Sequence, residues 1–181
     1  FKGPDARKFL DHILAGKLPK QGRISLSPML TYKGKLYGDL TVACLDENEF
    51  MIFGSGAAQE MHRRWFESHI NKFNVKYLNR SDDFHGISIA GPKSRDLFQK
   101  LVREDVSNKN FEFRDTRRMF VAGVPALVNR ISFTGELGYE IYVAPHFQLK
   151  LYEEIENAGK EFNLKPFGGR ALMSMRLEKS W

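Results

Sequence analysis

The sequence predicts an α+β fold in which one set of helices and antiparallel strands occurs twice. The first observation is a repeat, because residues 1–10 and 89–98 both place an apolar stub and a Gly-Pro pair before a helical pattern. The second is that alternating strand patterns and another helix follow each copy. Two copies are too few for a solenoid. We therefore predict one domain, residues 1–181, made of two half-units at residues 1–78 and 84–165. Each half-unit is expected to be an antiparallel sheet backed by helices.

Each half is expected to begin with a helix directly after its Gly-Pro pair. Proline suits the first helical position because its φ is fixed and its missing N–H loses no bond there. An apolar stripe with helical spacing follows in both copies: Phe9, Leu10, Ile13 and Leu14, then Leu97, Phe98, Leu101 and Val102. A second helix is expected to close each half, over residues 57–73 and 145–162.

Three strands are expected between the two helices of each half. Turn signals such as Lys33-Gly34 and Gly123 separate the strand patterns. The predicted strands cover residues 26–30, 35–44 and 49–54 in the first half, and 117–122, 125–133 and 138–144 in the second. Residues 79–83 form a polar connector between the halves.

One strand of each half carries an acid at its middle. Along residues 36–42, alternation puts Asp39 on one face with Tyr37 and Thr41, and the opposite, core face receives Leu36, Gly38, Leu40 and Val42. In the second half, Glu140 shares a face with Glu136, Gly138 and Tyr142. Acids are disfavoured in strands. A solvated sheet face explains either acid alone, whereas the pair favours a cleft that both carboxylates line.

Composition excludes several classes of function. The net charge is +6, but the 28 basic residues are scattered among 22 acids, so we expect no nucleic-acid partner. No apolar run is long enough to span a membrane. The single cysteine, Cys44, excludes an internal disulfide. His62 and His69 lack a third ligand at metal-binding spacing, so no metal site is expected.

Four ordered motifs resemble the folate-binding aminomethyltransferase family. They are GPDA at residues 3–6, the strand at 36–42, TGELGYE at 134–140 and RLEK at 176–179. The family includes the glycine-cleavage T-protein and the C-terminal folate portion of dimethylglycine and sarcosine dehydrogenases. MLTYKGKLY at residues 29–37 is more similar to the dehydrogenase branch.

The resemblance implies a T-protein-like, folate-binding fold with tetrahydrofolate at its centre. Asp39 occupies the position of the catalytic carboxylate, Glu140 that of the acid holding the pterin edge, and Thr41 that of a folate contact. The resemblance also implies cofactor-binding positions at Tyr37, Glu136 and Phe133. A buried carboxylate stabilises an iminium cation and can take the proton that the folate nitrogen sheds.

On this resemblance the chain is an enzyme, the folate-dependent part of a dimethylglycine or sarcosine dehydrogenase. It would capture the one-carbon group of an N-methylamine-derived iminium as methylene-tetrahydrofolate. FAD is expected only on a separate upstream domain, and a small barrel domain is expected downstream. The chain is then a fragment with weak or no activity alone, located in the bacterial cytoplasm or the mitochondrial matrix.

Three positions depart from the family pattern. Phe133 stands where many members have a tyrosine, Leu172 where T-proteins have an arginine, and Gly38 replaces the first acid of the T-protein pair. A T-protein is therefore one alternative, against which Leu172 and Gly38 count. Another is a non-catalytic relative such as the regulatory subunit of pyruvate dehydrogenase phosphatase. A third is a folate-fold protein of RNA modification or cluster assembly. A reactive cysteine in a signature loop would favour it, whereas Cys44 lies in an apolar strand.

Overall fold

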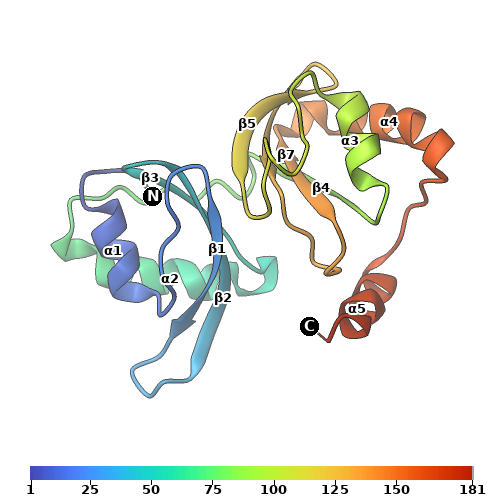
Figure 1. The fold of residues 1–181 in the computed structure, drawn as a ribbon. Coiled ribbons are helices and arrows are strands. Elements are labelled where there is room, and N and C mark those ends of the chain that lie inside the picture. Colours follow the sequence, from blue (N-terminus) through green and yellow to red (C-terminus); the bar gives the residue numbers. More distant parts are fainter. Residues whose placement is uncertain (181) are drawn as a thin grey trace. The chain divides into compact units, whose positions relative to one another are not determined.

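The computed structural model of the chain describes residues 1–180 (Figure 1). It is an α+β structure with antiparallel sheets, as predicted. The chain divides into two compact units, unit 1 over Phe1–Arg80 and unit 2 from Ser81 onward. That boundary lies within the polar connector expected at residues 79–83.

Unit 1 is a three-stranded sheet with its helices against one face. The strands lie in the order β1-β2-β3, and both pairs are antiparallel. Its elements are α1 (Ala6–Ile13), β1 (Ile24–Leu30), β2 (Leu36–Asp46), β3 (Glu49–Phe53) and α2 (Gln59–His69). Short 3₁₀ turns at Gly56–Ala58 and Ile70–Lys72 extend α2, so together they match the helix predicted over residues 57–73.

Unit 2 is a four-stranded sheet in the order β4-β7-β6-β5. Its elements are β4 (His85–Ala90), α3 (Ser94–Leu101), β5 (Thr116–Val121), β6 (Val124–Asn129), β7 (Gly138–Val143), α4 (Gln148–Gly159) and α5 (Gly169–Glu178). Turns at Pro145–Phe147 and Lys160–Phe162 extend α4 to the predicted range. The sequence did not predict β4 as a strand, because only its last two residues belong to the repeated stub.

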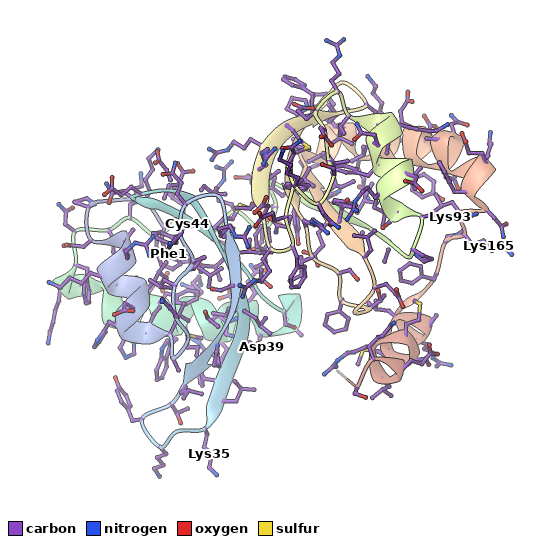
Figure 2. All side chains as sticks on the ribbon, viewed as in Figure 1. Phe1, Lys35, Asp39, Cys44, Lys93 and Lys165 are labelled. Atoms are coloured by element: carbon purple, nitrogen blue, oxygen red, sulfur yellow. The ribbon has the colours of Figure 1, made fainter. Side chains whose placement is uncertain are left out.

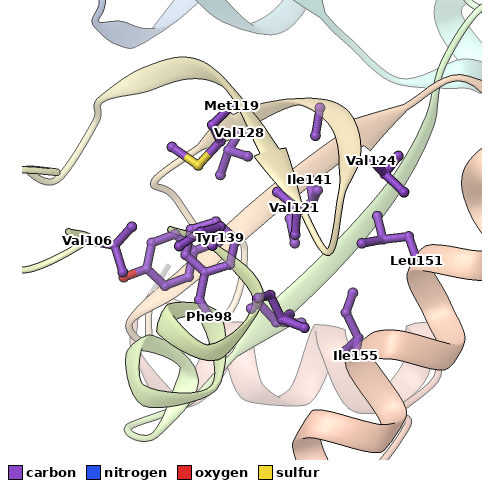
Figure 3. Close-up of a cluster of buried hydrophobic side chains, with 14 of the residues drawn as sticks. Phe98, Val106, Met119, Val121, Val124, Val128, Tyr139, Ile141, Leu151 and Ile155 are labelled. Atoms are coloured by element: carbon purple, nitrogen blue, oxygen red, sulfur yellow. The ribbon is translucent and has the colours of Figure 1, made fainter. Parts of the chain in front are cut away.

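Each unit has its own core, built from the predicted apolar stripes. In unit 1, Phe9 and Leu10 of α1 pack with Leu40 and Val42 of β2. In unit 2, Phe98 stacks on Tyr139 of β7 (Figure 3), and their ring centroids are 4.3 Å apart. These side chains are almost completely buried. In each unit, the helices that contribute to the core therefore cover one face of the sheet. None of them covers the other face.

The two Gly-Pro pairs form turns before their helices, so the predicted helix starts are wrong. The helices begin at Ala6 and Ser94, two residues after each proline. The cause is the glycine, whose φ is +145° at Gly3 and +125° at Gly91, values that suit glycine alone. Its carbonyl then accepts a hydrogen bond from the first helical N–H, at 3.0 Å in both units.

The connection from β6 to β7 also differs from the prediction. β6 ends at Asn129 rather than at residue 133, and β7 begins at Gly138. Between them the chain turns, with the Ser132 and Thr134 hydroxyls hydrogen-bonded at 2.8 Å. This turn carries Phe133 and Glu136, two of the predicted site residues, outside the strands.

Candidate functional site

Asp39 lies part way along β2, on the sheet face that the helices of unit 1 leave uncovered (Figure 2). It is exposed, and in the described part of the chain its carboxylate has no hydrogen bond or ion pair. Its partner across the sheet is Pro28, and Thr41 follows on the same face opposite Leu26. Leu26 is 42% exposed. Asp39 and Thr41 therefore form a polar pair on a largely apolar surface.

A β-bulge changes the predicted faces at the start of β2. Met29 pairs with Gly38, but the next residue, Leu30, pairs with Leu36, so Tyr37 is an extra residue on β2. The Tyr37 ring packs on Trp65 of α2 with centroids 4.6 Å apart, on the helix-covered side. Leu36 is 65% exposed instead of buried. The prediction that Tyr37 shares the face of Asp39, and that Leu36 faces the core, is therefore wrong.

His62 explains why residue 38 is glycine. A Cβ atom at position 38 would lie 2.8 Å from His62 Nε2 and 3.1 Å from Met29 Cε. The imidazole is buried, and Nε2 has no hydrogen-bond partner among the described residues. His62 thus occupies the volume that an acid at position 38 would need. His69, the other half of the histidine pair, shares a 2.6 Å hydrogen bond with Tyr32 instead.

Glu140 is the second mid-strand acid, at the centre of the unit 2 sheet. Its cross-strand partners are Ser88 on β4 and Asn129 on β6. The Tyr142 hydroxyl donates a 2.8 Å hydrogen bond to its Oε2. Burial raises the pKa of Glu140, and the hydrogen bond from Tyr142 opposes part of that rise. Burial also raises the pKa of Tyr142, with the nearby carboxylate adding to the effect.

Asn129 and Thr116 continue the row that contains Glu140, and the sequence did not single out either residue. Asn129 is completely buried, and its Oδ1 accepts a 2.7 Å hydrogen bond from the Thr116 hydroxyl. Its Nδ2 is buried without a hydrogen-bond partner among the described residues. The sequence offered one indication of Asn129, which is the polar residue that directly follows the apolar run at positions 126–128.

Phe133 contacts α5, and Glu136 contacts the residue that follows this helix. Glu136 forms an ion pair with Lys179 at 2.5 Å, and the Arg176 guanidinium lies over the Phe133 ring, 5.3 Å from its centroid. Glu136 also precedes β7, so the prediction that it shares a strand face with Glu140 is wrong. Leu172, on the same helix, is half-buried, and Arg170 is exposed.

The two acids share one feature of placement, although β2 is the second strand after α1 and β7 is the third strand after α3. Asp39 alternates with the core residues Leu40 and Gly38 on β2, and Glu140 alternates with the core residues Tyr139 and Ile141 on β7. Each carboxylate therefore stands at mid-strand on the face turned away from the helices. A carboxylate so placed can accept N–H donors, hold a cation or take a proton from a ligand on that face.

A cavity of about 820 Å³ lies elsewhere in unit 2. It follows the edge strand β4 and α4, and segment 162–167 completes its lining, which does not include Glu140. Across residues 1–180, no group of three or more His, Cys, Asp or Glu is placed to hold a metal ion. None of the helices described has the length and apolar character required to cross a membrane.

Comparison with known proteins matches residues 1–181 to the family described as GCVT N-terminal domain. The chain is 39% identical to mitochondrial dimethylglycine dehydrogenase of Homo sapiens, over 99% of the chain and 21% of that protein. It is 32% identical to an aminomethyltransferase of Thermoanaerobacter pseudethanolicus, over 98% of the chain and 48% of that protein. The chain thus spans less than half the length of either relative.

Two solved structures share the fold. Glycine cleavage system aminomethyltransferase T from Bartonella henselae superposes with a TM-score of 0.84 at 21% identity, covering 99% of this chain and 47% of that one. The heterotetrameric sarcosine oxidase from Corynebacterium superposes with a TM-score of 0.68 at 18% identity, covering 92% of this chain and 78% of that one. At these identities the superpositions establish the architecture.

Proposed function

The chain belongs to the GCVT N-terminal domain family, and on that premise we propose that it binds tetrahydrofolate and transfers a one-carbon unit to it. It would do so as the folate-binding part of a protein like dimethylglycine dehydrogenase. The observation that carries the proposal is that Asp39 and Glu140 each interrupt a core strand with a carboxylate on the uncovered face of its own sheet. The 39% identity to the human dehydrogenase favours that branch over the aminomethyltransferases, which are 31–34% identical.

The residues around Glu140 fit the group that they would hold. The pyrimidine edge of a pterin presents adjacent N–H donors, and a half-buried carboxylate accepts such donors strongly because water is largely excluded. The Tyr142 hydroxyl keeps Oε2 in position. The unpartnered donor of Asn129 in the same row is a further polar group for a ligand to satisfy. Glu140 would hold the pterin edge.

Asp39 would provide the chemistry. When bound, tetrahydrofolate supplies the nitrogen nucleophile that accepts the one-carbon group. The exposed, unpaired carboxylate of Asp39 stabilises the positive charge of an iminium brought to this face. Its oxygen also takes the proton that the nucleophilic nitrogen must lose. Thr41, on the same face, would add a hydrogen-bonding contact.

The structure limits how Glu136, Phe133 and Tyr37 could contact the ligand. Glu136 is ion-paired to Lys179, so it must exchange that partner to contact a ligand. Phe133 is 43% exposed and offers an apolar ring surface without the hydroxyl of a tyrosine. Tyr37 lies on the helix-covered side, so only a repacking of Trp65 would bring it to the ligand face. All three remain candidate ligand contacts, ranked below Asp39, Thr41 and Glu140.

The remaining parts of the proposal concern the whole protein. We propose that an upstream FAD domain oxidises an N-methylamine, dimethylglycine or sarcosine, and that a barrel domain follows this chain. The chain alone would then have little or no activity. The named human relative is mitochondrial, so a eukaryotic form would work in the mitochondrial matrix, and a bacterial form in the cytoplasm.

The test is an Asp39→Asn variant of the full-length protein, assayed with dimethylglycine and tetrahydrofolate. We expect amine oxidation to continue, with free formaldehyde replacing methylene-tetrahydrofolate as the product. Asp46→Asn is the matched control, since Asp46 is an exposed acid at the end of the same strand. Unchanged yield of methylene-tetrahydrofolate from Asp39→Asn would remove Asp39 from the mechanism. No amine oxidation by the unmodified protein would favour a non-catalytic relative.

A further inference from the structure

The amide of Asn129 is a buried donor without a partner. The side chain is fully enclosed, and Nδ2 has no hydrogen bond among the described residues. Leaving a buried polar group unsatisfied costs roughly 1–3 kcal/mol, so such groups are uncommon and call for an explanation. Because Nδ2 is enclosed, bulk water does not supply the missing acceptor. A ligand that enters on the side of Glu140, which is only half-buried, would bring an acceptor next to it.

The hydrogen bond to Thr116 fixes the orientation of the amide. Thr116 on β5 and Glu140 on β7 are the cross-strand partners on either side of Asn129. Residues directly opposite in an antiparallel sheet have side chains on the same face, about 5 Å apart at Cβ. Since Oδ1 accepts its bond from Thr116, the Nδ2 donor is left for the Glu140 side. A donor and a carboxylate acceptor therefore stand next to each other on one sheet face.

We propose that Asn129 and Glu140 together recognise a ring with an amide edge, in which an N–H adjoins a carbonyl. Glu140 accepts from the N–H, and Asn129 Nδ2 donates to the carbonyl oxygen. The inference rests on the proposed function and deepens it, because a 4-oxo pterin presents this edge. A 4-amino pterin presents an amino donor in place of the carbonyl oxygen, and that donor would oppose Nδ2. Its neutral ring also lacks the N–H beside it, so both Asn129 and Glu140 would favour the 4-oxo ring, and Asn129 would supply the part read at the carbonyl oxygen.

The experiment compares two ligands in each variant of the full-length protein. Affinities for tetrahydrofolate and for its 4-amino analogue, tetrahydroaminopterin, are measured by calorimetry. Asn129→Asp keeps an acceptor for Thr116 but replaces the donor with an acceptor. Asn129→Leu removes both groups at similar volume. We expect the ratio of affinities to shift toward the 4-amino ligand by about tenfold in Asn129→Asp, as for one lost and one gained hydrogen bond, and by less in Asn129→Leu.

Using a ratio separates recognition from folding, because a smaller folded fraction lowers the apparent binding of both ligands equally. Asn157→Asp is the matched control, since Asn157 is an exposed amide on α4, and its ratio should equal that of the unmodified protein. If tetrahydrofolate binds but the ratio in Asn129→Asp is unchanged, the inference is overturned and the proposed function stands. If the unmodified protein binds neither ligand, the proposed function fails and the inference fails with it.

Discussion

Oε2 of Glu140 receives a 2.8 Å hydrogen bond from the hydroxyl of Tyr142, two residues further along the same face of β7. The bond joins a carboxyl whose pKa is raised by burial to a phenol whose pKa is raised by burial and by that carboxylate. Burial has the larger effect on the pKa of the acid that we assign to ligand binding, and the bond from Tyr142 opposes it. Removing the Tyr142 hydroxyl should raise the pKa of Glu140.

Tyr142→Phe should move the pH dependence of tetrahydrofolate binding. The hydrogen bond lowers the pKa of Glu140, so its loss raises that pKa further. Binding through the ionised carboxylate should then weaken at a higher pH than in the unmodified protein. Calorimetric titrations from pH 5 to 8 measure the shift. Tyr152→Phe removes a similar bond to Glu156 on the surface of α4 and should change nothing. An unmoved pH midpoint in Tyr142→Phe would contradict the coupling.

Glu140→Gln should stabilise the protein at neutral pH. Because burial raises the folded-state pKa, the carboxyl stabilises the fold fully below its unfolded pKa of about 4.3 and loses this contribution as pH rises through the folded pKa. Glutamine resembles the protonated form and does not ionise. Melting temperatures should therefore agree near pH 4 and favour Glu140→Gln at pH 8. Equal melting temperatures at both pH values would show that the carboxylate is not destabilised by burial.

Gly38→Ala should destabilise the chain by about 1–3 kcal/mol, the usual cost of overpacking. The added Cβ would lie 2.8 Å from His62 Nε2. Gly56→Ala is the control, because a Cβ there meets nothing within 4 Å, and urea unfolding measures both. The cost of Gly38→Ala should be smaller when His62 is already alanine. If the cost is the same in that background, His62 is not the obstacle.

The sequence predicted the repeated elements well because their signals are local. Helical spacing of Phe9 and Leu10, and strand alternation around Ile141, depend only on neighbouring residues, and both became core faces. The Tyr37 bulge depends on where β1 meets β2, and the sequence of one strand does not contain that register. The predicted face of Tyr37 was therefore wrong because the bulge is set by strand pairing and not by the sequence of β2 alone.

The candidate site shows the same limit of a sequence read strand by strand. Asp39 and Glu140 interrupt apolar strands and can be noticed individually. Asn129 gains its significance from Thr116 and Glu140 on neighbouring strands, and the register that joins them appears only in the folded sheet. Likewise, Lys179 meets Glu136 through tertiary contact across 43 positions of sequence.

Phe133→Ala should loosen α5 more than Glu136→Gln does. The Arg176 guanidinium lies over the Phe133 ring, and such contacts contribute about 0.5–1 kcal/mol at exposed sites, in addition to the apolar area lost. The Glu136–Lys179 pair is about 40% exposed at both ends, so its contribution is at most about 1 kcal/mol. Hydrogen exchange of the α5 amides measures both changes. Phe120→Ala, at an exposed phenylalanine on β5, is the control.

Faster exchange confined to α5 in Phe133→Ala would support this contact as the anchor of the helix. Identical exchange in Phe133→Ala and Phe120→Ala would contradict it.

Calorimetric titration of tetrahydrofolate into the full-length protein, with Asp39→Asn and Glu140→Gln in parallel, tests most directly whether each of these two acids contributes to folate binding. We predict one bound tetrahydrofolate per chain, and affinities at least about tenfold weaker in each variant, as for the loss of a charge-assisted hydrogen bond. No binding by the unmodified protein, or full affinity retained in both variants, would contradict the account.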